Sequence, residues 1–163
     1  MLKVTNALLS ARDVTLVIAG RSTDLGQALA DELTAAGTPT VFVQADMEDV
    51  AAPAAIVAAA DERFGTVHGV VNIAASTFRD NVWTATPDGW DSMFAVNTRA
   101  PFFLIQEAAK LMKRSGAKGS VVNIGSVSGH GGQPFILSYC VSKGALATMT
   151  KSVSFALMRH GIR

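Results

Sequence analysis

Three side chains in this sequence are of types that exchange protons and are spaced so that they can share a site. Tyr139 and Lys143 are four residues apart, so they lie on the same face if their segment is a helix. A phenol has an unperturbed pKa of about 10, and it needs a neighbouring cation to work as an acid or base at neutral pH. Lys143 can be that cation. Ser126 stands in a glycine-rich stretch after an apolar run, and we expect it to face the pair.

Taken alone, a tyrosine four residues before a lysine is more often an ordinary amphipathic pair, so the elements around it matter. Short apolar runs rich in β-branched residues alternate here with helical patterns. The expected strands are 14–19, 40–45, 67–74 and 120–124, and the expected helices are 25–36, 50–64, 90–114 and 138–160. This alternation predicts an α/β fold: a doubly wound, Rossmann-like parallel sheet with right-handed crossovers, helices on both faces and strand order 2-1-3-4.

Composition narrows the class of protein. The 163 residues predict a single domain, 1–163, and 49% hydrophobic with only 17% charged residues predicts extensive burial in a sheet or an oligomer interface. Basic and acidic residues number 14 and 13 with no basic run, so we expect no nucleic-acid partner. One cysteine and three scattered histidines predict neither a disulfide nor a metal site. The apolar run near the start is too short for a membrane span, and we expect a cytoplasmic protein.

Ligands of doubly wound sheets bind at the carboxyl ends of the strands, where the winding direction reverses. The loops that follow the expected strands are 20–26, 46–47, 74–76 and 125–133. We therefore expect the binding site to be built from these loops. His130 is expected to face solvent, and Cys140 is expected to be a small buried residue rather than a nucleophile.

Several motifs together resemble the short-chain dehydrogenase/reductase family over nearly the whole chain. They are VNIAA at 71–75, WD at 90–91 with VN at 96–97, VVNIGS at 121–126 and YCVSK at 139–143. The resemblance implies NAD(P)-dependent hydride transfer between a nicotinamide and a carbonyl or alcohol substrate, with a 3-oxoacyl reductase-like activity as one candidate. It also implies a homodimer or homotetramer.

The same resemblance assigns roles to four catalytic residues. Tyr139 would be the acid/base, and Ser126 would hydrogen-bond the substrate oxygen. Lys143 would lower the pKa of the phenol and hold the nicotinamide ribose. Asn97 would help to place Lys143 through a water molecule and serve the proton path.

Cofactor-binding residues follow from the resemblance as well. Asn72 matches the asparagine of the family's NNAG turn, which steadies the central strands and lines the adenosine side of the cleft with Ala74 and Ala75. The turn departs from the pattern, since Ile73 replaces the second asparagine and Ala75 the glycine. Asp46, with the backbone of Met47 beside it, matches the acidic residue that contacts the adenine.

The stretch 19–26 aligns with the family in two ways. In the first alignment it is the pyrophosphate loop, to which Ser22 belongs, with Gly20 and Gly26 retained, Ala19 in place of the threonine and Asp24 in place of the middle glycine. In the second alignment it ends the family's second strand, and Arg21 recognises the 2′-phosphate of NADP. We favour the first alignment because Gly20, Gly26, Ala28, Leu33 and Gly37 fall at the expected intervals, while Arg21 gives a slight preference for NADP.

Either alignment leaves one βα unit of the family unmatched, and the family's last two strands are also unmatched. The resemblance predicts roughly 250 residues in one domain, and this sequence has 163. The alternative hypothesis is a catalytically incomplete family member that acts only in nucleotide binding or oligomerisation.

Overall fold

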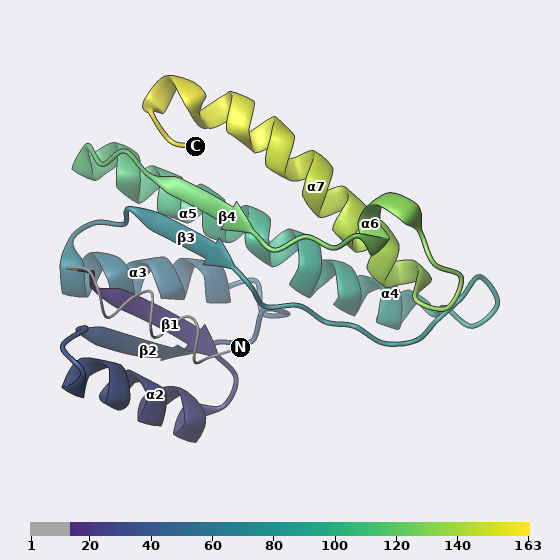
Figure 1. The fold of residues 1–163 in the computed structure, drawn as a ribbon, viewed down its shortest axis with the longest axis horizontal. Helices are drawn as coiled ribbons and strands as arrows, with labels where there is room; N and C mark the ends of the chain where they lie inside the picture. The colour runs from purple at the N-terminus through teal and green to yellow at the C-terminus, as the bar shows by residue number, and fades with distance from the viewer. Residues whose placement is uncertain (1–13) are drawn as a thin grey trace.

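The computed structural model describes residues 14–163 and has the alternating architecture predicted for a doubly wound fold (Figure 1). All four strands point the same way, and each crossover contains a helix. The elements in chain order are β1 (Leu16–Gly20), α2 (Thr23–Ala35), β2 (Thr40–Gln44), α3 (Ala52–Phe64), β3 (Gly69–Asn72), α4 (Pro87–Phe94), a π-helix (Ala95–Arg99), α5 (Ala100–Ser115), β4 (Ser120–Asn123), α6 (Ser128–Gly131), α7 (Leu137–Leu157) and a 3₁₀ turn (Met158–His160).

The strands form two hydrogen-bonded pairs. β1 pairs with β2 in parallel from Leu16↔Thr40 to Gly20↔Gln44. β3 pairs with β4 in parallel from Gly69↔Ser120 to Asn72↔Asn123. Figure 1 shows the spatial order β2, β1, β3, β4, which agrees with the predicted order 2-1-3-4. Within residues 14–163, however, no ladder joins β1 to β3.

Helices cover both faces of the β1–β2 pair. Successive strand residues point to opposite faces, so Phe42 and Val43 serve different helices. Phe42 lies against Gly26 of α2, where any added Cβ atom would meet its ring. Val43 packs in the other direction, into a cluster with Ala52 and Ile56 of α3. The predicted two-sided packing is confirmed for this pair.

The β3–β4 pair is covered on one face only by the described residues. Val70 packs with Ala108 and Met112 of α5 in the main core cluster. On the opposite face, Val71 is 55% exposed and Val122 is 47% exposed. One apolar face of this strand pair is therefore partly open to solvent within the part of the chain that the structure describes.

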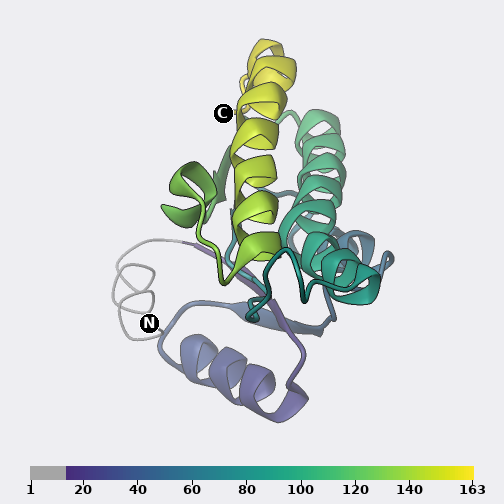
Figure 2. The ribbon, with the colours of Figure 1, turned by 90° about the vertical axis from the view of Figure 1, so that its right-hand side faces the viewer.

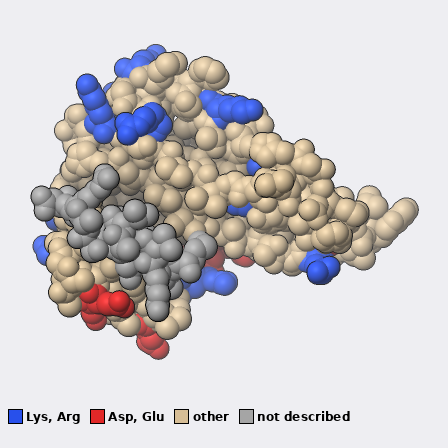
Figure 3. Space-filling view, viewed as in Figure 1, with Lys and Arg blue, Asp and Glu red and all other residues tan. Residues whose placement is uncertain are grey.

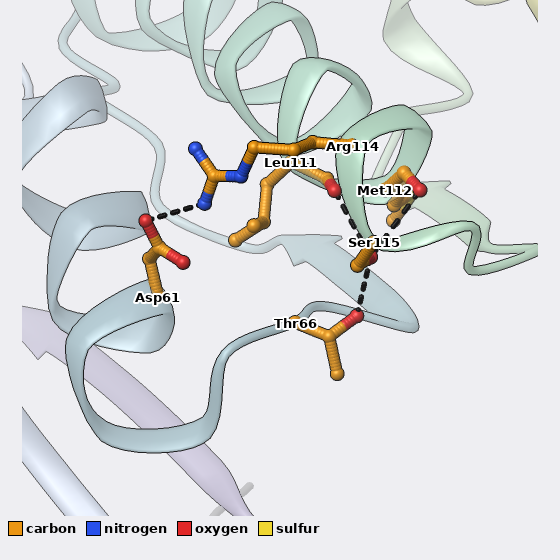
Figure 4. A network of polar contacts seen from close by, with 6 residues as sticks. All are labelled: Asp61, Thr66, Leu111, Met112, Arg114 and Ser115. Carbon is orange, nitrogen blue, oxygen red and sulfur yellow. Dashed lines mark hydrogen bonds and ion pairs between the residues drawn. The ribbon is translucent and has the colours of Figure 1, made fainter.

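The packing of α3 against α5 joins the two halves of the molecule. Leu104 of α5 packs against both apolar clusters, so the core is continuous although the strand ladders are not. Polar contacts fasten the ends of the two helices (Figure 4). Arg114 pairs with Asp61 at 2.5 Å, and the hydroxyls of Ser115 and Thr66 are 2.8 Å apart. An exposed ion pair contributes at most about 1 kcal/mol, so the apolar contacts dominate this junction.

Helices α5 and α7 lie side by side, and α6 flanks α7 (Figure 2). The face drawn in Figure 3 is largely uncharged, with basic and acidic side chains in small separate groups. No helix within residues 14–163 is long and apolar enough to cross a membrane.

Candidate active site

Helix α7 carries both Tyr139 and Lys143. The Nζ atom of Lys143 lies 5.9 Å from the centre of the Tyr139 ring, so the two side chains share a face of the helix as the spacing predicted. Lys143 is only 3% exposed, and its Nζ donates a 2.7 Å hydrogen bond to the carbonyl oxygen of Ile124. This bond holds the ammonium group beside the carboxyl end of β4.

Burial lowers the pKa of Lys143 below its ordinary value of 10.5, because desolvation penalises the charged form. An ammonium group has three N–H donors, and the Ile124 carbonyl takes one of them. The other two are available to an anion or to hydroxyl groups placed beside them. The centre of the Tyr139 ring lies 5.9 Å from this ammonium group.

Ser126 follows β4 and is half-buried. Its Oγ atom accepts a 3.2 Å hydrogen bond from the backbone N–H of Ser128, so the hydroxyl hydrogen remains free to be donated. Gly129 fixes this loop against α7, because a Cβ atom there would lie 2.8 Å from the carbonyl carbon of Lys143 and from the backbone nitrogen of Gly144. The glycine-rich loop that follows Ser126 therefore packs closely against the helix that carries Tyr139.

Asn97 sits in the middle of the π-helix and is 1% exposed. Its Oδ1 atom accepts from the backbone N–H of Ser76 at 2.8 Å, and its Nδ2 atom donates to the Ser76 carbonyl at 3.0 Å. Nδ2 also donates to Ser142 Oγ at 2.9 Å, one residue before Lys143. Short π-helical turns inside α-helices are frequent at functional sites. Here the turn lets one amide join the segment after β3 to α7.

The predicted helix over 90–114 is therefore three consecutive segments, α4, the π-helix and α5. Pro101 does not break it, since it lies in the first turn of α5, where a proline is tolerated. The sequence contained the asparagine but no signal for the change in helical type.

Asn72 belongs to a polar chain at the ends of β3 and β4. Its Nδ2 atom donates to Asn123 Oδ1 at 2.7 Å, and Asn123 in turn donates to Thr150 Oγ1 of α7 at 2.9 Å. This chain ties the two strands to the helix. Ala74 and Ala75 follow directly and are exposed, so their backbone is open to a ligand.

The ends of β1 and β2 meet at a small cavity of about 280 Å³ lined by Arg21, Gln44, Ala45 and Asp46. Gln44 Nε2 donates to the Arg21 carbonyl at 3.4 Å. Asp46 Oδ1 accepts the backbone N–H of Glu48 at 3.0 Å, which turns the chain away from the sheet. Met47 is half-buried beside the cluster that packs under α3. The structure thus brings together Arg21 and Asp46, which are far apart in the sequence.

Gly26 has a packing role in this structure. A Cβ atom at this position would lie 2.0 Å from Cε2 of Phe42, so α2 can approach β2 only because the residue is a glycine. Ser22 makes no side-chain cap bond to α2, and Asp24 lies exposed in the first turn of that helix. A carboxylate in the first turn favours the helix but repels a phosphate. The carboxylate of Asp24 therefore argues against a phosphate at the start of α2.

A second cavity lies elsewhere, between α6 and α7, and has a volume of about 880 Å³. Among its lining residues are His130, which is exposed, and Cys140, which is buried, as expected for both. None of the four predicted catalytic residues lines it. No group of three or more potential metal ligands occurs within residues 14–163.

Sequence reasoning missed several polar residues that hold the site. Ser76 and Ser142 are the partners of Asn97, and Gly129 sets the distance between the Ser126 loop and α7. Asp80 and Ser138 form a buried pair at the start of α7. Ser142 could have been found, since it lies between Tyr139 and Lys143, whereas Asp80 has no sequence signal.

Comparison with known proteins agrees with the resemblance found in the sequence motifs. A protein-family model described as short chain dehydrogenase matches residues 3–163. The NADP-dependent (R)-specific alcohol dehydrogenase of Lentilactobacillus kefiri is 33% identical over 151 residues, which is 91% of this chain and 59% of that protein. The chain spans about half to two-thirds of the length of the curated relatives it matches.

Two solved structures are similar along almost the whole chain. A metagenomic short-chain oxidoreductase in complex with NADP has a TM-score of 0.88 at 26% identity, and the match covers 97% of this chain and 71% of that one. A protein assigned as a betaketoacyl-ACP reductase has a TM-score of 0.85 at 30% identity, covering 98% of this chain and 63% of that one. With the family model matching residues 3–163 and the motifs lying together at the ends of β3 and β4, the chain belongs to the short-chain dehydrogenase family.

Proposed function

We propose that this chain is the core of an NAD(P)-dependent oxidoreductase that interconverts a carbonyl and an alcohol. The observation that carries the proposal is the position of Lys143, buried beside Tyr139 and bonded to the end of β4, with Asn97 bonded to the neighbouring Ser142. A buried lysine beside a phenol is suited to proton transfer.

The proposed roles follow from the hydrogen-bonding capacity of each group. Tyr139 donates its phenolic proton to the carbonyl oxygen during reduction, and Lys143 stabilises the phenolate that remains. Ser126 donates a hydrogen bond to the same oxygen, since its Oγ lone pair is already held by the Ser128 N–H. When bound, the nicotinamide supplies the hydride to the carbonyl carbon. Asn97 holds Ser76 and Ser142 and so fixes the walls of the site.

We propose that β1 corresponds to the family's second strand, which is the second of the two alignments. Dinucleotide-binding sheets have the strand order 3-2-1-4-5-6. In that order, strand 1 separates strand 2 from strand 4. If β2, β1, β3 and β4 are strands 3, 2, 4 and 5, ladders are expected between β2 and β1 and between β3 and β4. None is then expected between β1 and β3. The observed pairing has this pattern. The first alignment requires a ladder between β1 and β3, which the described residues lack.

This assignment changes the proposed contacts of Gly20, Ser22 and Gly26. They lie near the adenosine end of the cofactor rather than at its pyrophosphate, and Arg21 faces the 2′-phosphate. The cavity shared by Arg21 and Asp46 supports this, because it offers a guanidinium for a phosphate and a carboxylate for the adenine. We therefore propose NADP as the preferred cofactor. Asn72, Ala74 and Ala75 are proposed to line the adjoining part of the cleft.

Substitution of Tyr139 by phenylalanine tests the activity. Tyr139→Phe removes the only group proposed to exchange the substrate proton, and we expect NADPH-dependent reduction of model ketones to fall by about 100-fold or more. Val141→Ala, two residues along the same helix and 43% exposed, is the matched control and should keep full turnover. Full activity of Tyr139→Phe would refute the assignment.

Fluorescence titration with NADPH and NADH tests cofactor binding without turnover. We expect NADPH to bind more tightly than NADH. Equal affinity for the two would contradict the role of Arg21, and the absence of binding by either would favour the alternative of a catalytically incomplete family member.

The remaining expectations stay proposals. We propose a homodimer or homotetramer that uses α5 and α7, on which Phe103 and Phe155 are 41% and 74% exposed. A sedimentation experiment tests this. We also propose a small carbonyl or alcohol substrate, with 3-oxoacyl compounds among the candidates. A single domain and a cytoplasmic location are part of the same proposal.

A further inference from the structure

A buried carboxylate lies outside the predicted catalytic set. Asp80, in the loop between β3 and α4, is 5% exposed. Its Oδ1 atom accepts the backbone N–H of Ser138 at 3.1 Å, and its Oδ2 atom accepts the Ser138 hydroxyl. The two ion pairs found within residues 14–163 do not include Asp80. Its hydrogen-bond donors come instead from the start of α7.

Helix α7 has no cap of its own. The first N–H groups of a helix lack intrahelical partners, and a nearby Ser, Thr, Asp or Asn usually accepts one of them. The residue before α7 is Ile136, which makes no side-chain cap bond. Asp80 takes that role from 58 residues earlier in the chain. The positive end of the helix dipole also favours a carboxylate at this place.

The backbone around Asp80 adds two further connections. The Asp80 N–H donates to the Phe135 carbonyl at 3.2 Å, and the Leu137 N–H donates to the Asp80 carbonyl at 3.4 Å. The Arg79 guanidinium lies 5.5 Å from the centre of the Phe135 ring. Four residues before Asp80, Ser76 is bonded to Asn97. The segment 76–80 therefore links the π-helix to the first turn of α7.

We propose that Asp80 is a positioning residue for Tyr139. Tyr139 directly follows Ser138, so the bonds from Asp80 fix the turn of helix from which the phenol projects. A displacement of about 1 Å at a reacting group can reduce turnover by about 100-fold. The proposal rests on the proposed function, because the orientation of Tyr139 matters to catalysis only if the phenol exchanges a proton.

Four substitutions separate positioning from general stability. Asp80→Ala removes both acceptors, Asp80→Asn keeps an oxygen for the Ser138 N–H, and Ser138→Ala removes only the hydroxyl donor. Asp49→Ala is the matched control, since Asp49 Oδ1 accepts the Ala51 N–H at 2.9 Å at the start of α3, away from Tyr139. Circular dichroism of each variant establishes that it is folded.

The sequence contains one tyrosine, so NMR of the chain with labelled tyrosine reports Tyr139 alone and needs no turnover. We expect Asp80→Ala to shift or broaden the ring signals, Ser138→Ala to do so less, and Asp80→Asn and Asp49→Ala to leave them unchanged. Ring signals of Asp80→Ala that superimpose on those of the wild type would overturn the proposal.

Kinetics give the second readout. We expect Asp80→Ala to lower kcat by about 10- to 100-fold while the KM for NADPH stays within about twofold, and Asp80→Asn to restore most of kcat. Equal loss of kcat in Asp49→Ala would reduce Asp80 to a structural role and overturn the proposal. If Tyr139→Phe keeps its turnover, the proposed function fails, and the tyrosine spectrum alone then decides whether Asp80 positions the ring.

Discussion

Replacement of Gly26 by alanine tests how closely α2 packs against β2. The added Cβ atom would lie 2.0 Å from Cε2 of Phe42, about 1.4 Å inside the 3.4 Å at which ordinary van der Waals contact begins. Two more atoms of the same ring lie 2.4 Å away, so no small rotation of Phe42 relieves the overlap. The ring has to move, and α2 has to move with it or separate from β2.

The cost follows from the size of this overlap. Overpacking of this kind costs about 1 to 3 kcal/mol. Alanine is better than glycine inside a helix by about 1 kcal/mol, which offsets part of the loss. Since an approach of 2.0 Å places the cost at the upper end of that range, we expect Gly26→Ala to lower the free energy of unfolding by about 2 kcal/mol. Urea denaturation measures it, and Gly69→Ala in β3, where an added Cβ meets nothing within 4 Å, is the control.

A double substitution makes the test specific. Phe42→Leu removes the ring atoms that meet the new methyl group, so the pair Gly26→Ala and Phe42→Leu should be more stable than the sum of the single effects by about 1 kcal/mol or more. A Gly26→Ala chain as stable as the wild type would contradict this packing role of Gly26.

Three further predictions concern the site itself. Asn97→Ala leaves the Ser76 N–H without its acceptor and should lower the free energy of unfolding by about 1 to 3 kcal/mol in urea denaturation. Burial lowers the pKa of Lys143, so the unfolded chain binds that proton more tightly than the folded chain. The contribution of this group to the free energy of unfolding therefore rises with pH up to 10.5. Lys143→Met should flatten that rise in denaturation curves taken from neutral pH upward. Arg21→Ala should weaken NADPH binding by about 10- to 100-fold and leave NADH binding unchanged, and an equal loss for both cofactors would contradict contact with the 2′-phosphate.

The elements of the fold could be predicted because each is coded locally. β1 ends at Gly20, one residue after the predicted end of the first strand at residue 19. The predicted helix 138–160 is present as α7 and the short turn that follows it. Apolar periodicity and glycine stops belong to single segments, so they can be recognised without knowledge of the tertiary structure.

The supports of the candidate site could not be predicted in the same way. Tyr139 and Lys143 are four residues apart on one helix, so their spacing alone places them together. Asp80 and Ser138 are separated by 58 residues, and their contact depends on how a loop lies against a helix end. An aspartate in a polar loop has many other uses, as turn residue or solvent-exposed charge. Its burial is a property of the packed structure.

The interpretation of Gly26 shows how one interval can have two causes. Glycine at this position satisfied the spacing of a phosphate-binding loop, and the same residue is required wherever a helix approaches a strand closely. The sequence cannot separate the two causes, because both need the absence of a Cβ atom. In this structure a Cβ atom at position 26 would meet the Phe42 ring, a contact that both alignments allow. The strand ladders do separate the two alignments: within residues 14–163, β1 is bonded to β2 and not to β3, as expected if β1 is the second strand of a dinucleotide-binding sheet.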